Sequence, residues 1–137
     1  MISTFPLMAI ALIGYNLLVY GLGINGTDWD RPVTSLMMMS GVTWSMTIRD
    51  VLIVVGLFLL FFEILKATRI GKLSIVDHLL STLVLIGFII EFLVVPAAAT
   101  STFFILMMMA LVDVMAGFSV SIRSATRDLH VGDGAAL

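Results

Sequence analysis

The stretch FFEILKATRIGKLSIVDHLLST, residues 61–82, decides the fold class, because ionisable groups interrupt a chain that is otherwise strongly apolar. Glu63 stands directly behind two phenylalanines, and Lys66 follows it three residues later. The full chain has 137 residues, of which 61% are hydrophobic and only 12% are charged. A soluble domain of this size would lack the polar residues needed to cover its surface. The sequence therefore predicts an integral membrane protein.

Four apolar segments contain or flank this stretch, and each reaches the roughly 20 residues needed to cross a ~30 Å hydrocarbon core. We expect membrane spans at about residues 5–24, 49–69, 75–95 and 100–122. The sequence shows no internal repeat and no linker, so the whole chain is expected to form a single integral membrane domain. The predicted fold class is an all-α membrane protein, a four-transmembrane-helix bundle.

The first loop, residues 25–48, carries a signal of its own. Residues 42–49, VTWSMTIR, alternate apolar and polar side chains, and residues 33–39 upstream are also mostly apolar. Alternation at period two is typical of a strand. Ser40 and Gly41 between the two segments suit a tight turn, because glycine tolerates positive φ. The pattern predicts a short β-hairpin in this loop.

The alternative for this loop is an amphipathic segment that lies in the membrane interface with Trp29 and Trp44 at headgroup level. If the hairpin forms, we expect it to pack on a neighbour, since an isolated two-stranded hairpin is marginally stable in water.

Basic residues gather at one end of the predicted bundle, namely Lys66, Arg69, Lys72, Arg123 and Arg127. Cytoplasmic loops of membrane proteins carry an excess of lysine and arginine. We therefore expect a bacterial inner (plasma) membrane protein with both termini and a tail, residues 123–137, in the cytoplasm. Residues 25–48 would then lie outside.

Counting along the helices at ~1.5 Å per residue brings ionisable groups from three spans to similar depths. The predicted intramembrane polar layer consists of Glu63, Lys66, His78, Ser81 and Asp113. Two further acidic groups, Asp50 and Glu91, are expected nearer the outer side. Small residues are expected where helices approach closely, at Gly14, Gly21, Ala110 and Gly117.

The polar layer has two explanations. In the structural one, Glu63 is paired with Lys66 or Arg123 and the layer fixes which helices pack together, because a buried charge is costly unless it is paired. In the other, Glu63, Asp113 and His78 form a proton or cation relay. The nearby basic residues favour the structural explanation, since a relay needs a carboxylate that is unpaired and reachable by water.

The sequence offers little support for a cysteine, haem or copper site. The chain has no cysteine, so thiolate metal sites and cysteine nucleophiles are excluded. Haem ligation by two histidines would need His78 from two subunits, because His130 lies in the tail. The triplets at residues 37–39 and 107–109 offer soft thioethers for Cu(I), but contiguous methionines point around a helix and fit packing better. We expect no metal, no cofactor and no enzymatic activity.

The expected function is that of a structural or accessory subunit of a homo-oligomer or a larger membrane complex. Its partners would be the lipid bilayer and either further copies or other membrane-protein subunits. A net charge of −2 without a basic stripe excludes nucleic acid. The alternatives are an oligomeric proton or cation channel or transporter that uses the intramembrane carboxylates, and a lipid-modifying enzyme.

Overall fold

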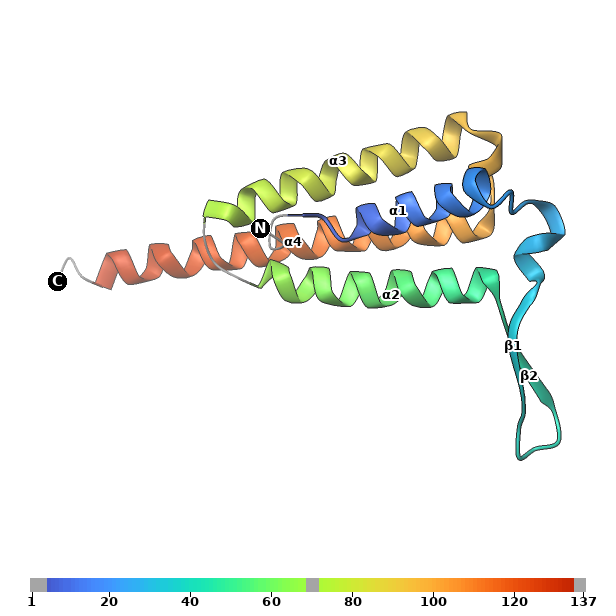
Figure 1. Cartoon of the computed structure of the whole chain (residues 1–137). Coiled ribbons are helices and arrows are strands. Elements are labelled where there is room, and N and C mark those ends of the chain that lie inside the picture. Colours follow the sequence, from blue (N-terminus) through green and yellow to red (C-terminus); the bar gives the residue numbers. More distant parts are fainter. Residues whose placement is uncertain (1–4, 69–71, 135–137) are drawn as a thin grey trace.

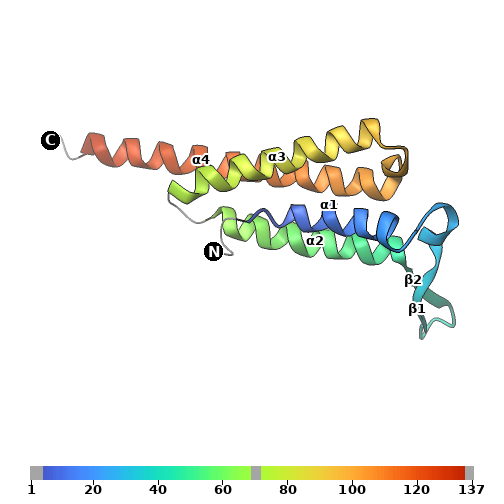
Figure 2. The ribbon, with the colours of Figure 1, turned by 45° about the horizontal axis from the view of Figure 1, so that its top comes forward.

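The chain folds into an elongated bundle of helices with a hairpin at one end (Figure 1). The computed structural model describes residues 5–68 and 72–134. Its α-helices are α1 (Met8–Asn16), α2 (Ile48–Ala67), α3 (Lys72–Val94) and α4 (Ser101–Gly134). The helices lie alongside one another in both views, and α4 packs most extensively against α2 and α3 (Figures 1 and 2). The predicted mostly helical architecture with a small hairpin is confirmed.

Two segments of the described residues are long and apolar enough to cross a membrane, Ile75–Val94 in α3 and Ser101–Arg127 in α4. A shorter apolar helix, Met8–Gly21, combines α1 with the π-helical turn η2 (Leu17–Gly21). The length of α2 is comparable, but it carries charged residues at both ends. These findings support the predicted membrane location weakly, by length and composition alone.

Among the described residues, two of the four predicted spans are therefore long and apolar enough to cross a membrane, and the helix bounds also differ from the predicted ones at the ends. The first helix begins at Met8 and its last turn widens to π geometry, in which the N–H of Leu22 donates to the carbonyl of Leu17 at 3.1 Å. The last helix continues past the predicted span and through most of residues 123–137, ending at Gly134. Charged and polar residues after Ile122 therefore extend the helix instead of ending it.

The hairpin consists of β1 (Pro32–Met37) and β2 (Thr43–Thr47), paired antiparallel with Leu36 opposite Trp44. Its loop is longer than the tight turn predicted at Ser40 and Gly41. The N–H of Gly41 donates to the carbonyl of Met38, and the N–H of Met38 donates to the carbonyl of Val42, each at 2.9 Å. Gly41 has φ 84°, a conformation that favours glycine.

The predicted second strand was wrong at its end, because Ile48 and Arg49 belong to α2. A capping box starts this helix. The Asp50 carboxylate accepts from the N–H of Thr47 at 2.9 Å, and the Thr47 hydroxyl accepts from the N–H of Asp50 at 3.3 Å. Because this box satisfies backbone N–H groups at the helix start, α2 begins at Ile48, two residues before the end of the predicted strand.

An aromatic cluster fills the bundle near the hairpin end. Tyr15 of α1 stacks on Trp29 at a ring-centroid distance of 5.0 Å and meets Phe103 of α4 edge-on at 4.8 Å. The Tyr15 hydroxyl lies 2.7 Å from the carbonyl oxygen of Ala97, to which it donates, and 2.8 Å from the hydroxyl of Thr100. Trp29 is therefore a buried core residue that packs inside the bundle.

Helices α2 and α4 approach closely at Gly56, which was not among the small residues predicted at helix contacts. A Cβ at this position in α2 would lie 2.7 Å from Leu106 Cδ2 and 3.0 Å from Met109 Sδ of α4. A Cβ added at Gly14 would lie an ordinary 3.9 Å from Leu52 Cδ1 of α2.

Two of the other small residues expected at helix contacts do lie buried in α4, namely Ala110 and Gly117. Gly21 does not serve as predicted. It is exposed, and the nearest described neighbour of an added Cβ is Leu17 of its own turn, because the chain leaves the bundle there.

We predict that Gly56→Ala destabilises the bundle by about 1–3 kcal/mol, because the new methyl group enters a space already filled by Leu106 and Met109. Gly87→Ala is the matched control, since its Cβ would meet Leu12 Cδ2 at an ordinary 3.6 Å. Thermal unfolding of both variants in one detergent measures the difference. Equal midpoints for the two variants would contradict the tight contact between α2 and α4.

Candidate functional site

The ammonium group of Lys66 is the centre of a buried polar layer at the end of the bundle opposite the hairpin. Its Nζ atom lies 3.0 Å from Glu63 Oε1 and 2.9 Å from Asp77 Oδ1. It also donates to the carbonyl oxygen of Phe5 at 2.7 Å. The contacts with the two carboxylates are ion pairs, and Asp77 Oδ1 has no hydrogen-bond partner among the described residues, whereas the contact with Phe5 is a hydrogen bond. The Lys66 side chain is only 10% exposed.

Glu63 is 2% exposed and connects three helices. Its Oε1 atom faces Lys66 and accepts from the Ser81 hydroxyl of α3 at 3.3 Å, while its Oε2 atom accepts from the backbone N–H of Leu7 at 2.8 Å. Leu7 is the N-cap of α1, where the helix dipole favours a negative charge. The carboxylate therefore serves as the capping partner of a helix far away in the sequence.

Asp113 brings α4 into the same layer. It is 3% exposed and lies close enough to the charges of Glu63, Asp77 and Lys66 to interact with them, beside the hydroxyl of Ser81. Its Oδ2 atom is buried and has no hydrogen-bond partner among the described residues. The described part of the layer thus holds three carboxyl groups and one ammonium group.

His78 contacts α4 through its ring. The imidazole lies so close to Gly117 that an added Cβ would collide with Nδ1, and it stacks with Phe118 at a centroid distance of 6.3 Å. Gly117 is therefore the residue that leaves room for the ring. His78 is half-buried, whereas its neighbour Asp77 is 6% exposed and belongs to the layer.

The structure brings together four of the predicted layer residues, Glu63, Lys66, Ser81 and Asp113. It adds Asp77, which the sequence analysis left outside the set. The spacing alone could have found it, because Asp77 and Ser81 are four residues apart on one helix face. Arg123, the other cation proposed for Glu63, is exposed, so the pairing is with Lys66.

No feature of the sequence predicted that backbone groups at the start of α1 would bind Glu63 and Lys66. Neither the carbonyl of Phe5 nor the N–H of Leu7 differs in the sequence from any other peptide group. Pro6 between them is buried, and proline is well suited to the beginning of a helix.

The two acidic residues nearer the hairpin end stand apart from the layer. The Asp50 carboxylate is part of the capping box of α2, where its Oδ2 atom also accepts from the Thr47 hydroxyl at 2.7 Å. Glu91 is half-buried on α3, close enough to Tyr15 to interact with its hydroxyl. In the described ranges, no cluster of three histidine or acidic side chains has the arrangement of a metal site.

Comparison with known proteins gives no family for this chain: no family model, curated protein or solved structure matches it.

We predict that Lys66→Met lowers the free energy of unfolding by about 3–5 kcal/mol, because Glu63 and Asp77 would stay buried without their counter-charge. Arg123→Met is the control, since this exposed cation should change stability by no more than about 0.5 kcal/mol. Adding Glu63→Gln and Asp77→Asn to Lys66→Met should restore part of the loss. Thermal or denaturant unfolding in detergent tests all three variants, and a Lys66→Met variant as stable as the control would rule out the pairing.

Proposed function

We propose that the chain is a small integral membrane protein that acts as a structural or accessory subunit of a homo-oligomer or a larger membrane complex. The proposed location is a bacterial inner membrane with both termini in the cytoplasm. One observation carries this proposal: a hairpin with apolar side chains extends from the bundle, and it is exposed except at the end of β2 that joins α2.

The hairpin leaves the end of the bundle sideways, across the direction of the helices (Figures 1 and 2). Every residue of β1 is exposed, including Leu36 at 58% and Met37 at 79%. A two-stranded hairpin is marginally stable alone, and exposed apolar surface of this kind marks an interaction site. A partner that covers the hairpin would supply the missing stability.

The two faces of the hairpin differ. Side chains of directly paired residues lie on one face of an antiparallel ladder. Leu36 pairs with Trp44, and the next pair on that face is Thr34 with Met46. The opposite face carries the pairs Ser35 with Ser45 and Met37 with Thr43. We propose that the Leu36 and Trp44 face is the one that meets the partner.

The polar layer supports a structural role as well. Lys66 contacts polar groups from three segments of the chain, and both oxygens of Glu63 have partners. Such a network orients helices and keeps the interior charge-paired.

We predict that native mass spectrometry, from mild detergent and from lipid nanodiscs, finds assemblies heavier than the 14.9 kDa chain. Trp44→Ser should reduce the assembled fraction, because it removes apolar area from the interacting face. Ser45→Thr on the other face is the matched control. Detection of the 14.9 kDa chain alone under both conditions would overturn the proposal.

The alternative is an oligomeric proton or cation pathway, and one observation favours it. The described layer has more carboxyl groups than cations, and the Oδ2 atom of Asp113 is buried without a hydrogen-bond partner in that part of the chain. A carboxyl group of this kind inside a membrane is a candidate for proton or ion transfer.

Amide substitutions separate the two functions. We predict that Glu63→Gln is destabilised by about 1–3 kcal/mol, because Lys66 loses one of its two counter-charges and the N–H of Leu7 loses a charged acceptor. Asp113→Asn should be nearly as stable as the parent, since it removes repulsion from Glu63 and Asp77. Unfolding and pH-driven proton flux are measured in liposomes, where we expect no parent flux. A parent that conducts protons, together with a stable but silent Asp113→Asn, would establish the pathway instead.

A further inference from the structure

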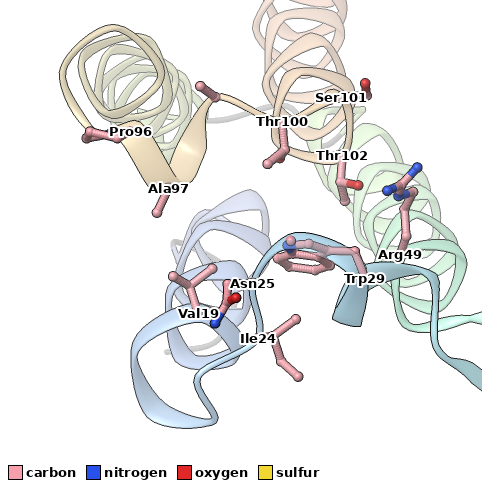
Figure 3. A pocket seen from close by; sticks show the side chains of 12 residues that line it. Val19, Ile24, Asn25, Trp29, Arg49, Pro96, Ala97, Thr100, Ser101 and Thr102 are labelled. Carbon is pink, nitrogen blue, oxygen red and sulfur yellow. The ribbon is translucent and has the colours of Figure 1, made fainter.

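A cavity of about 390 Å³ lies at the hairpin end of the bundle, far from the polar layer. It is bordered by the starts of α2 and α4, the connection between α3 and α4, and the segment after α1 (Figure 3). Arg49, Trp29, Thr100, Ser101 and Thr102 are among the residues that line it. None of them takes part in the proposed assembly surface of the hairpin.

Arg49 gives the cavity its cation. Figure 3 shows its guanidinium group pointing toward the start of α4, where Ser101 and Thr102 lie. One terminal nitrogen of Arg49 lies 3.1 Å from Asp30 Oδ1, an exposed carboxylate. The Nε atom is buried and has no hydrogen-bond partner among the described residues. A buried donor without a partner costs about 1–3 kcal/mol, so a ligand that accepts from it would be bound favourably.

Thr102 adds a hydroxyl to the lining of the cavity. The residue is only 2% exposed, and its hydroxyl makes no hydrogen bond within residues 5–68 and 72–134. The start of α4 adds backbone donors. Thr100 accepts from the N–H groups of Phe103 and Phe104, at 3.1 and 3.0 Å. The N–H groups of Ser101 and Thr102 belong to the first turn of α4, where a helix offers no acceptor of its own. Such a helix start binds anions, and an arginine beside it binds phosphate well.

An apolar groove of about 320 Å³ adjoins the cavity on the flank of α3 and α4. The groove and the cavity share Ala99, Thr100 and Ser101 as lining residues. The remaining lining of the groove is Phe92, Phe104 and Ile105. A cationic, hydroxyl-lined cavity next to an apolar groove matches a ligand with an anionic head and a hydrocarbon tail.

We propose that this end of the bundle binds one anionic phospholipid. Its phosphate lies between Arg49 and the start of α4, and one acyl chain lies along Phe92 and Phe104. The proposal rests on the membrane location proposed above, because the lipid comes from the leaflet at the hairpin end. Free phosphate shares the head-group chemistry but has nothing to place in the groove.

The test uses the full chain in nanodiscs of phosphatidylcholine alone or with phosphatidylglycerol. Native mass spectrometry counts retained lipids, and thermal unfolding is followed in parallel, with inorganic phosphate added to the phosphatidylcholine discs. We expect one retained phosphatidylglycerol and a raised unfolding midpoint with that lipid, and no shift with phosphate. Arg49→Gln and Thr102→Val should each weaken retention, Arg49→Gln by about tenfold or more. Arg31→Gln, an exposed arginine outside the cavity, is the control.

The outcomes separate the two proposals. Retention of phosphatidylglycerol no better than phosphatidylcholine, or unchanged in both Arg49→Gln and Thr102→Val, would overturn the lipid site. A shift with inorganic phosphate equal to that with the lipid would overturn the role of the groove. A chain that does not co-elute with nanodiscs would overturn the membrane location itself, and with it the lipid site.

Discussion

The buried ammonium group of Lys66 is the constraint on which the rest of the bundle depends. A cation that is only 10% exposed needs counter-charges, and its contacts come from the start of α1, from α2 itself and from α3. Glu63, paired with this cation, then fixes the N-cap of α1 and the hydroxyl of Ser81. Apolar side chains alone would allow the helices to rotate or slide, whereas these directional contacts allow few arrangements.

The two ends of the bundle are stabilised by different chemistry. One end has the ion pairs around Lys66. The other has the aromatic cluster of Tyr15, Trp29 and Phe103, and the Tyr15 hydroxyl binds the connection between α3 and α4. Between them, Gly56 lets α2 and α4 approach closely. The proposed lipid cavity adjoins the aromatic end, where Trp29 contributes to both the core and the cavity wall.

The sequence predicted the helices and the hairpin well, because apolar runs and strict alternation are local patterns. It also predicted that Glu63, Lys66, Ser81 and Asp113 lie at one depth, since depth follows from helix rise. It missed the peptide groups of Phe5 and Leu7, which any residue could supply. It did not predict the burial of Trp29 against Tyr15, because no local pattern encodes this contact.

The capping of α1 by Glu63 has a consequence for the order of folding. The first helix is made first, but the groups that bind its start belong to α2, and the rings that pack on Tyr15 include one from α4. Until those segments are synthesised, the N–H of Leu7 and the carbonyl of Phe5 have no protein partner of this kind. Docking of the start of α1 therefore waits at least until α2 has been synthesised.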